Sequence, residues 1–175
     1  MGGPTVGLLL SEEREPSVFM KELAELLRGF CDPVEQGATG GLHFRISDAA
    51  LVGLPGHDAE QLCSFHLDIG PAPAEDDEDY SALPWVPIQE ICLGGYQSGR
   101  ENQRALGNLA LLLAERLDAL VDFYGLLDQA PSEPVVGRIY ETSYQIDGDS
   151  RGHSHVGDSA FLGAWLRSPD FQMIE

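Results

Sequence analysis

The side chains best suited to metal chemistry lie close together near the C-terminus. His153 and His155 are two residues apart, so in an extended segment both imidazoles share one face, and Asp158 follows soon after. Closed metal sites in proteins need three or four ligands, and this trio is a loose one. Asp158 also suits the N-cap of a short helix. We therefore expect no stoichiometric metal and no cofactor.

Motifs that would indicate an enzyme do not occur in the sequence. It contains no GxSxG, no phosphate-binding P-loop and no HExxH, and the pairs Gly40-Gly41 and Gly94-Gly95 lack the flanking residues of a phosphate loop. His43 and His66 fall on the polar faces of predicted strands, where a solvated side chain is expected. The sequence thus predicts a protein without catalytic activity.

The three cysteines, Cys31, Cys63 and Cys92, form no CxxC pair, and their number is odd. Cys63 and Cys92 lie inside predicted strands, and no cationic neighbours that would activate a thiolate are visible near them. We expect all three to be buried, reduced thiols in a reducing compartment.

Charge is the extreme property of this chain. Its 29 acidic and 10 basic residues give a net charge of −19, and no Lys or Arg occurs between Ile46 and Gly99. Such a field repels nucleic acid and anionic membranes and attracts basic proteins. The same acidity would also serve solubility or adaptation to salt. A GC-rich genome, which replaces lysine by arginine, would explain why Lys21 is the single lysine. These alternatives stay open.

The acidic run 75–79 is the densest part of this charge, within a Pro- and acid-rich loop near 70–84. Because adjacent like charges repel, we expect the run to be exposed and mobile in the free protein. Aromatic side chains beside it would supply the desolvated anchors of an interface. The predicted surface for a basic protein consists of Asp58, Glu60, Glu75, Asp76, Asp77, Glu78, Asp79, Tyr80 and Trp85.

Hydrophobic periodicity predicts the elements that position these residues. The expected strands are 5–10, 42–46, 61–69, 86–96 and 135–146. Residues 171–174 form a last strand or a tail, and whether 121–124 forms another strand is open. The expected helices run from Pro16 to the stop at Asp32-Pro33, from 101 to about 121, and from Asp158 to about 166. Neighbouring strands imply antiparallel pairing. The predicted fold is a single α+β domain over 1–175, a mainly antiparallel sheet packed with two longer helices and one short C-terminal helix.

The apolar stretches of the chain are short. Val6 to Leu10 is too brief for a signal sequence, with Glu12 and Glu13 directly after it, and no segment is long enough to cross a bilayer. We expect a cytoplasmic protein that contacts neither membrane nor nucleic acid.

Both ends of the chain resemble a family of small, uncharacterised bacterial proteins with a domain of unknown function. The similar segments are HVGDSAFL at 155–162, AWL at 164–166, SPDF at 168–171, GPTV at 3–6 and FCDP at 30–33. The resemblance implies a small, acidic, immunity-type protein that neutralises a toxin. We therefore expect a non-enzymatic inhibitor of a basic toxin or nuclease domain. A structural or regulatory subunit of a protein assembly and a small metal-dependent hydrolase remain alternatives, and the oligomeric state is open.

Overall fold

One antiparallel sheet organises the chain in a computed structural model that describes residues 3–74, 77–128, 136–147 and 150–174. Its nine strands lie in the order β2-β3-β4-β6-β1-β7-β9-β8-β5. The strands are β1 Thr5–Leu10, β2 Cys31–Gln36, β3 Leu42–Ile46, β4 Phe65–Pro71, β5 Glu78–Asp79, β6 Gln89–Gly95, β7 Leu120–Asp122, β8 Ile139–Asp147 and β9 Ser150–Gly157. Every described pair of neighbouring strands is antiparallel.

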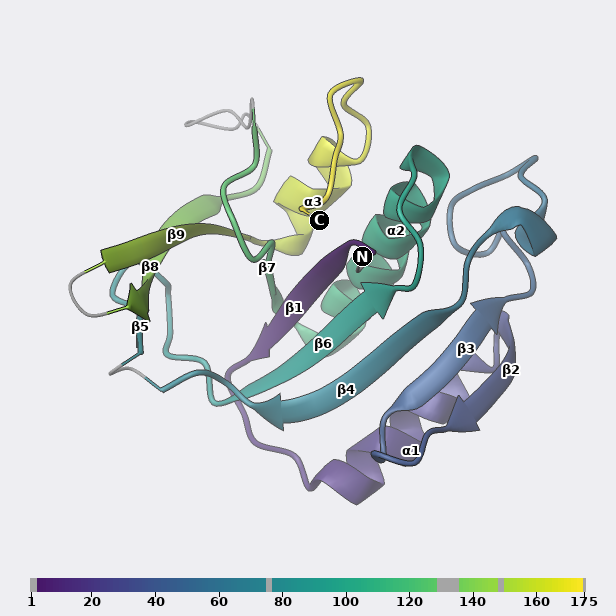
Figure 1. The fold of residues 1–175 in the computed structure, drawn as a ribbon, viewed down its shortest axis with the longest axis horizontal. Coiled ribbons are helices and arrows are strands. Elements are labelled where there is room, and N and C mark those ends of the chain that lie inside the picture. The colour runs from purple at the N-terminus through teal and green to yellow at the C-terminus, as the bar shows by residue number, and fades with distance from the viewer. Residues whose placement is uncertain (1–2, 75–76, 129–135, 148–149, 175) are drawn as a thin grey trace.

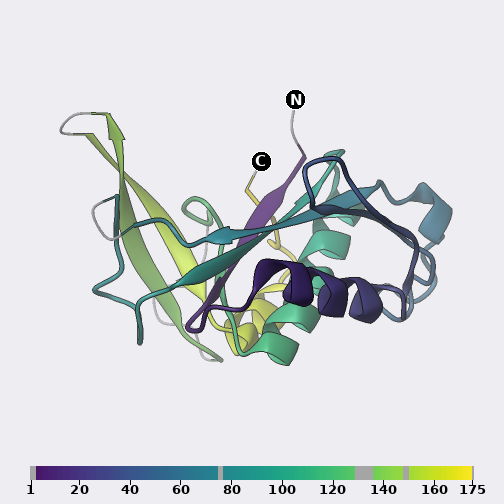
Figure 2. The same ribbon diagram turned by 90° about the horizontal axis from the view of Figure 1, so that it is seen from below.

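Three helices, α1 Pro16–Leu27, α2 Arg100–Leu117 and α3 Ser159–Trp165, cover one face of this sheet (Figures 1 and 2). α2 packs across β6, β1 and β7, with α3 beside it, and α1 packs under β2 and β4. The predicted α+β class, with two longer helices and a short C-terminal one, is confirmed.

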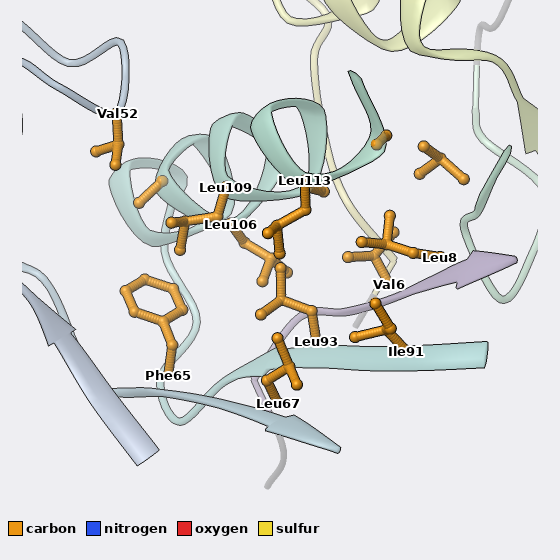
Figure 3. Packing of buried hydrophobic residues seen from close by; sticks show 14 of the residues in the cluster. Val6, Leu8, Val52, Phe65, Leu67, Ile91, Leu93, Leu106, Leu109 and Leu113 are labelled. Atoms are coloured by element: carbon orange, nitrogen blue, oxygen red, sulfur yellow. The ribbon is translucent and has the colours of Figure 1, made fainter. Parts of the chain in front are cut away.

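The main core lies between the sheet and this helical layer. Val6 and Leu8 of β1 point toward α2 and meet Leu106, Leu109 and Leu113, all of them fully buried (Figure 3). β1 sits between β6 and β7, which explains why five of its six residues are buried rather than alternating with solvated ones. Each such aliphatic side chain stabilises the fold by about 1.5–3 kcal/mol relative to an exposed one.

Side chains from outside the helices fix where two of them begin. The Glu15 carboxylate accepts from the amides of Ser17 and Val18, so α1 begins at Pro16 as predicted. Asp158 is the N-cap of α3, as predicted, and accepts from the Phe161 amide at 2.7 Å.

Some predicted boundaries are wrong. α1 ends at Leu27 rather than at Asp32-Pro33, and Cys31–Gln36 forms the edge strand β2, with a bulge between Cys31 and Val34. Strand 61–69 begins only at Phe65, because Asp58 caps a short 3₁₀ turn, Ala59–Gln61, before it. Residues 171–174 form no strand. Instead, Phe171 and Met173 are buried in the main core.

The sheet surface opposite the helices, here called the outer face, carries no helix from the described part of the chain (Figure 2). A second, smaller apolar cluster of Leu9, Tyr80, Leu83, Leu120 and Val156 covers part of it, with Trp85 and Tyr140 packed at its margin. The β8–β9 hairpin rises on this side of the sheet (Figure 2). Polar side chains gather between that hairpin and the centre of the sheet.

Candidate functional site

Three carboxylates from three different strands lie on the outer face. Glu78 comes from β5, Glu90 from β6 and Asp122 from β7, and we call them the carboxylate cluster. Burial raises the pKa of both glutamates, and the charge of Asp122 raises it further.

Gly7 of β1 opens the space that brings part of this cluster together. It lies opposite Cys92 of β6 and Asp122 of β7 in the sheet register. Over it, Tyr124 Oη donates a hydrogen bond to Glu90 Oε1 at 2.7 Å. A Cβ atom on Gly7 would collide with Glu90 Oε1 and lie 2.9 Å from Tyr124 Oη. The Glu90–Tyr124 pair therefore requires glycine at this position.

Asp122 is the most deeply buried member of the cluster, with 4% of the residue exposed. Its Oδ1 accepts hydrogen bonds from Ser154 Oγ and from the Tyr124 amide at 2.8 Å. Both bonds end on Oδ1, and across the described ranges no donor reaches Oδ2. Burial raises the pKa of this carboxyl, against the two hydrogen bonds, which lower it.

Glu78 is also buried, at 7% exposure, which corrects the prediction that the whole acidic run is exposed. The physical reason is strand pairing. β5 pairs with β8, so side chains alternate along β5. Glu78 is buried, and Asp79 points to the opposite side of the strand, into solvent. Glu78 accepts from Tyr80 Oη at 3.1 Å and from Thr142 Oγ1 at 3.2 Å. Burial raises its pKa, and so does the charge of Asp122.

Glu90 is half-buried, and burial raises its pKa, while the hydrogen bond from Tyr124 lowers it. Within the described residues, the ion pairs are Arg14–Glu22 and His153–Glu141, and neither involves the carboxylate cluster. The cluster thus holds three partly or fully desolvated acids with no cation of this chain's described residues bound to them. Burying carboxylates without a cation is unfavourable, and it is what raises their pKa values.

A cavity of about 380 Å³ opens beside this cluster. Glu78, Asp122 and Ser154 are its buried lining, and Asp77 and Gln145 are exposed. Pro73, Tyr124 and Tyr144 complete the lining. The arrangement presents acidic and aromatic groups to a ligand of modest size, which suits a cation.

The structure brings only part of the predicted binding surface together. Asp77 and Asp79 are exposed beside the buried Glu78 and Tyr80, and Trp85 is half-buried against the second apolar cluster. Glu75 and Asp76 lie outside the described residues.

Asp58 and Glu60 lie elsewhere. Both are exposed next to the short 3₁₀ turn, where Arg45 of β3 donates to the Glu60 carbonyl at 3.2 Å. β3 lies near one edge of the sheet and β5 forms the other. These two acids are therefore not part of one surface with the run at 77–79.

The C-terminal trio of possible metal ligands serves three separate structural contacts. His153 Nδ1 pairs with Glu141 Oε1 at 2.8 Å, His155 Nδ1 accepts from the Leu127 amide at 3.0 Å, and Asp158 caps α3. Over the ranges that the structure describes, no three His, Cys, Asp or Glu side chains are grouped so that they could hold a metal ion.

The strand pattern predicted solvated side chains at His43 and His66, but in the structure both make contacts within the protein. They face each other across β3 and β4, and His43 Nδ1 is 2.6 Å from Tyr96 Oη. His66 Nδ1 is buried without a hydrogen-bond partner among the described atoms, and burial lowers the pKa of this imidazole. Gly94 provides the space for the His66 ring.

All three cysteines are free thiols, of which Cys31 and Cys63 are buried as predicted and Cys92 is half-buried. Cys63 lies before β4 rather than inside a strand, which corrects that placement. Burial raises the pKa of Cys31 to about 12 and also raises that of Cys92. Cys31 and Cys92 therefore lack the lowered pKa of a reactive cysteine.

Glu90, Asp122, Tyr124 and Ser154 were not among the site residues predicted from the sequence. One signal was present in the sequence, since Asp122 interrupts the apolar run LVDF and Glu90 precedes the apolar ICL of a strand. A single carboxylate within a buried strand is a marker of a functional or strained position. The strand order that brings these residues together carries no such local signal.

The family comparison covers nearly the whole chain. Residues 2–175 match a family of unknown function, DUF6368. The chain belongs to this family. No curated protein and no solved structure matches it. In the described part of the protein, no helix has the length and apolar character needed to cross a membrane.

Proposed function

We propose that this DUF6368 protein is a non-enzymatic binding protein that docks a basic protein against the outer face of its sheet. The observation that carries the proposal is the carboxylate cluster. Glu78 and Asp122 are buried and Glu90 is half-buried on a face that no described helix covers, and no cation of the described residues pairs with them. A cationic partner would supply the missing counter-charge.

The wider charge distribution supports the same surface. Glu78 and Glu90 belong to the base-free stretch between Ile46 and Gly99, and the exposed Asp68 of β4 extends the acidic surface across the sheet. A field of one sign concentrates oppositely charged partners and speeds their association, an effect that weakens as salt rises.

An immunity-type inhibitor of a toxin is the role that we propose for this surface. Proteins that cut or bind nucleic acid carry basic surfaces that contact phosphates. An acidic, concave partner would cover such a surface and compete with the nucleic acid for it. The cytoplasmic location and the bacterial source expected from the sequence are part of the same proposal.

The experiment compares two variants that lose the same amount of charge. The outer-face variant carries Asp68→Asn and Asp77→Asn, and the control carries Glu25→Gln and Glu115→Gln, all at exposed positions. Wild type and both variants are used to capture proteins from the host, and association rates with any captured basic protein are then measured at low salt. We expect the outer-face variant to associate several-fold more slowly and the control to resemble wild type.

Two results would contradict the proposal. Equal slowing by both variants would show that only total charge matters. Capture of neutral or acidic proteins alone would show that the acidic face is not a docking surface for a basic partner.

A further inference from the structure

The cavity beside the carboxylate cluster indicates how the partner is anchored. We propose that it binds one arginine guanidinium of the basic partner, an inference that rests on the proposed function. The cavity lies between β5, β7 and the β8–β9 hairpin, and its buried lining includes Glu78, Asp122 and Ser154.

The size of the cavity limits what it can hold. Ligand pockets range over about 300–1,000 Å³, and about 380 Å³ is near the lower end of that range. A single long side chain fits this space, whereas a helix or a strand of the partner does not. The rest of the partner would lie on the exposed surface around Asp77 and Gln145.

The acceptors of the buried lining match a guanidinium in chemistry. Asp122 uses Oδ1 for its two internal hydrogen bonds, which leaves Oδ2 as an acceptor that no described donor occupies. Glu78 accepts one hydrogen bond on each oxygen, and each carboxylate oxygen has two lone pairs. A guanidinium offers five N–H donors in a planar fork and loses less hydration energy than an ammonium, so arginine suits this lining better than lysine.

The aromatic side chains of the cavity are held in place before any ligand arrives. Tyr124 is fixed by its hydrogen bond to Glu90. Tyr144 lies against Gly152, its partner in the β8–β9 register, where a Cβ atom would overlap the phenol ring. Preformed aromatic surfaces reduce the entropy lost on binding and attract a cation to their faces.

The cation on β9 does not occupy this position. Arg151 is exposed, and its Nη1 donates to Ser143 Oγ at 3.0 Å. Arg151 and Ser143 are at the strand positions that alternate with those of Tyr144 and Ser154, so they face the other side of the hairpin.

The test uses N-acetyl-arginine amide as the probe, with N-acetyl-citrulline amide as its neutral analogue of similar shape. Binding to the intact protein is measured by calorimetry or by NMR titration. We expect the arginine probe to bind saturably and the citrulline probe not to bind. Asp122→Asn should weaken binding of the arginine probe about tenfold to a hundredfold, because a hydrogen bond to a charged group is lost. Glu141→Gln removes an exposed carboxylate outside the cavity and should leave binding unchanged.

Three results would overturn the inference. The citrulline probe binds as well as the arginine probe, the arginine probe shows no saturable binding, or a folded Asp122→Asn variant binds it as wild type does. If Asp122→Asn does not fold, Tyr144→Ala replaces it. That variant should weaken binding several-fold, and wild-type affinity would overturn the inference.

The two proposals can fail separately. If the arginine probe binds but the protein captures no basic partner, the proposed function is refuted and the cavity remains a cation site. A basic partner whose binding is unaffected by a saturating arginine probe would support the proposed function and refute the arginine anchor.

Discussion

At the scale of single residues, Gly7 is the position on which the geometry of the outer face depends. Gly7→Ala would force Glu90 or Tyr124 to move, because the new methyl group would overlap Glu90 Oε1. We expect the free energy of unfolding to fall by about 1–3 kcal/mol, as for other overpacked positions. Urea unfolding monitored by tyrosine and tryptophan fluorescence measures this change.

Gly70 of β4 provides the matched control, since a Cβ atom there meets no other atom within 4 Å. Gly70→Ala should leave stability nearly unchanged. If the two variants prove equally stable, the contact of Glu90 and Tyr124 over Gly7 does not exist in solution.

The buried carboxyls give stability an unusual dependence on pH. The pKa values of Glu78, Glu90 and Asp122 are raised in the folded protein, mainly by burial. Between the unfolded pKa values, near 4, and the raised folded ones, the native state holds more protons than the unfolded state. The contribution of these groups to stability is therefore present below about pH 4 and is lost as pH rises through the folded pKa values.

Asp122→Asn isolates this contribution from that of the other acids. We expect the free energy of unfolding of the variant to fall less steeply than that of wild type from about pH 4 to pH 8. Urea unfolding at a series of pH values in this range gives both slopes. Parallel curves would mean that the Asp122 carboxyl does not carry a raised pKa.

At the scale of elements, Asp158 joins α3 to the beginning of β8. Its Oδ1 caps α3 at the Phe161 amide, and its Oδ2 accepts from the Arg138 amide at 3.0 Å. Asp158→Ala should lower the free energy of unfolding by about 0.5–2 kcal/mol, the usual cost of losing an N-cap. Thermal and urea unfolding check this value, with Asp170→Ala, an exposed acid after α3, expected to have little effect.

The elements that could be predicted from sequence are those whose hydrophobic pattern is regular. α1 and α2 follow apolar periodicity, β1 is a nearly continuous apolar run, and the start of α3 follows from its cap at Asp158. β5 was missed because its two residues, Glu78 and Asp79, look like solvated charge, although pairing with β8 buries one of them. β9 was missed because SRGHSHVG carries few apolar residues.

For residues 171–174 the sequence left a strand or a tail open, and the structure has no strand there. Phe171 and Met173 alternate like a strand, yet they are buried in the main core without joining the sheet. Alternation at the end of a chain thus reports burial and does not decide between a strand and an irregular segment.

At the scale of the whole molecule, the carboxylate cluster is a product of strand order. β5, β6 and β7 are consecutive strands in the sequence, but they occupy different places in the sheet, with β5 at its edge and β1 between β6 and β7. The charge of the chain and the base-free stretch were visible in the sequence. Which of the many acids would be buried together was not, because that depends on long-range register.

The most direct measurement of the central claim is NMR mapping of the site where a basic ligand docks. Backbone amide shifts of the isotope-labelled protein are followed during titration with a short arginine-rich peptide, at low and at moderate salt. The outer-face proposal predicts the largest changes at Glu78, Asp122, Tyr144 and Ser154, weakening as salt rises. Changes centred on the exposed acids of α1 and α2, such as Glu25 and Glu115, with none at the carboxylate cluster, would contradict it.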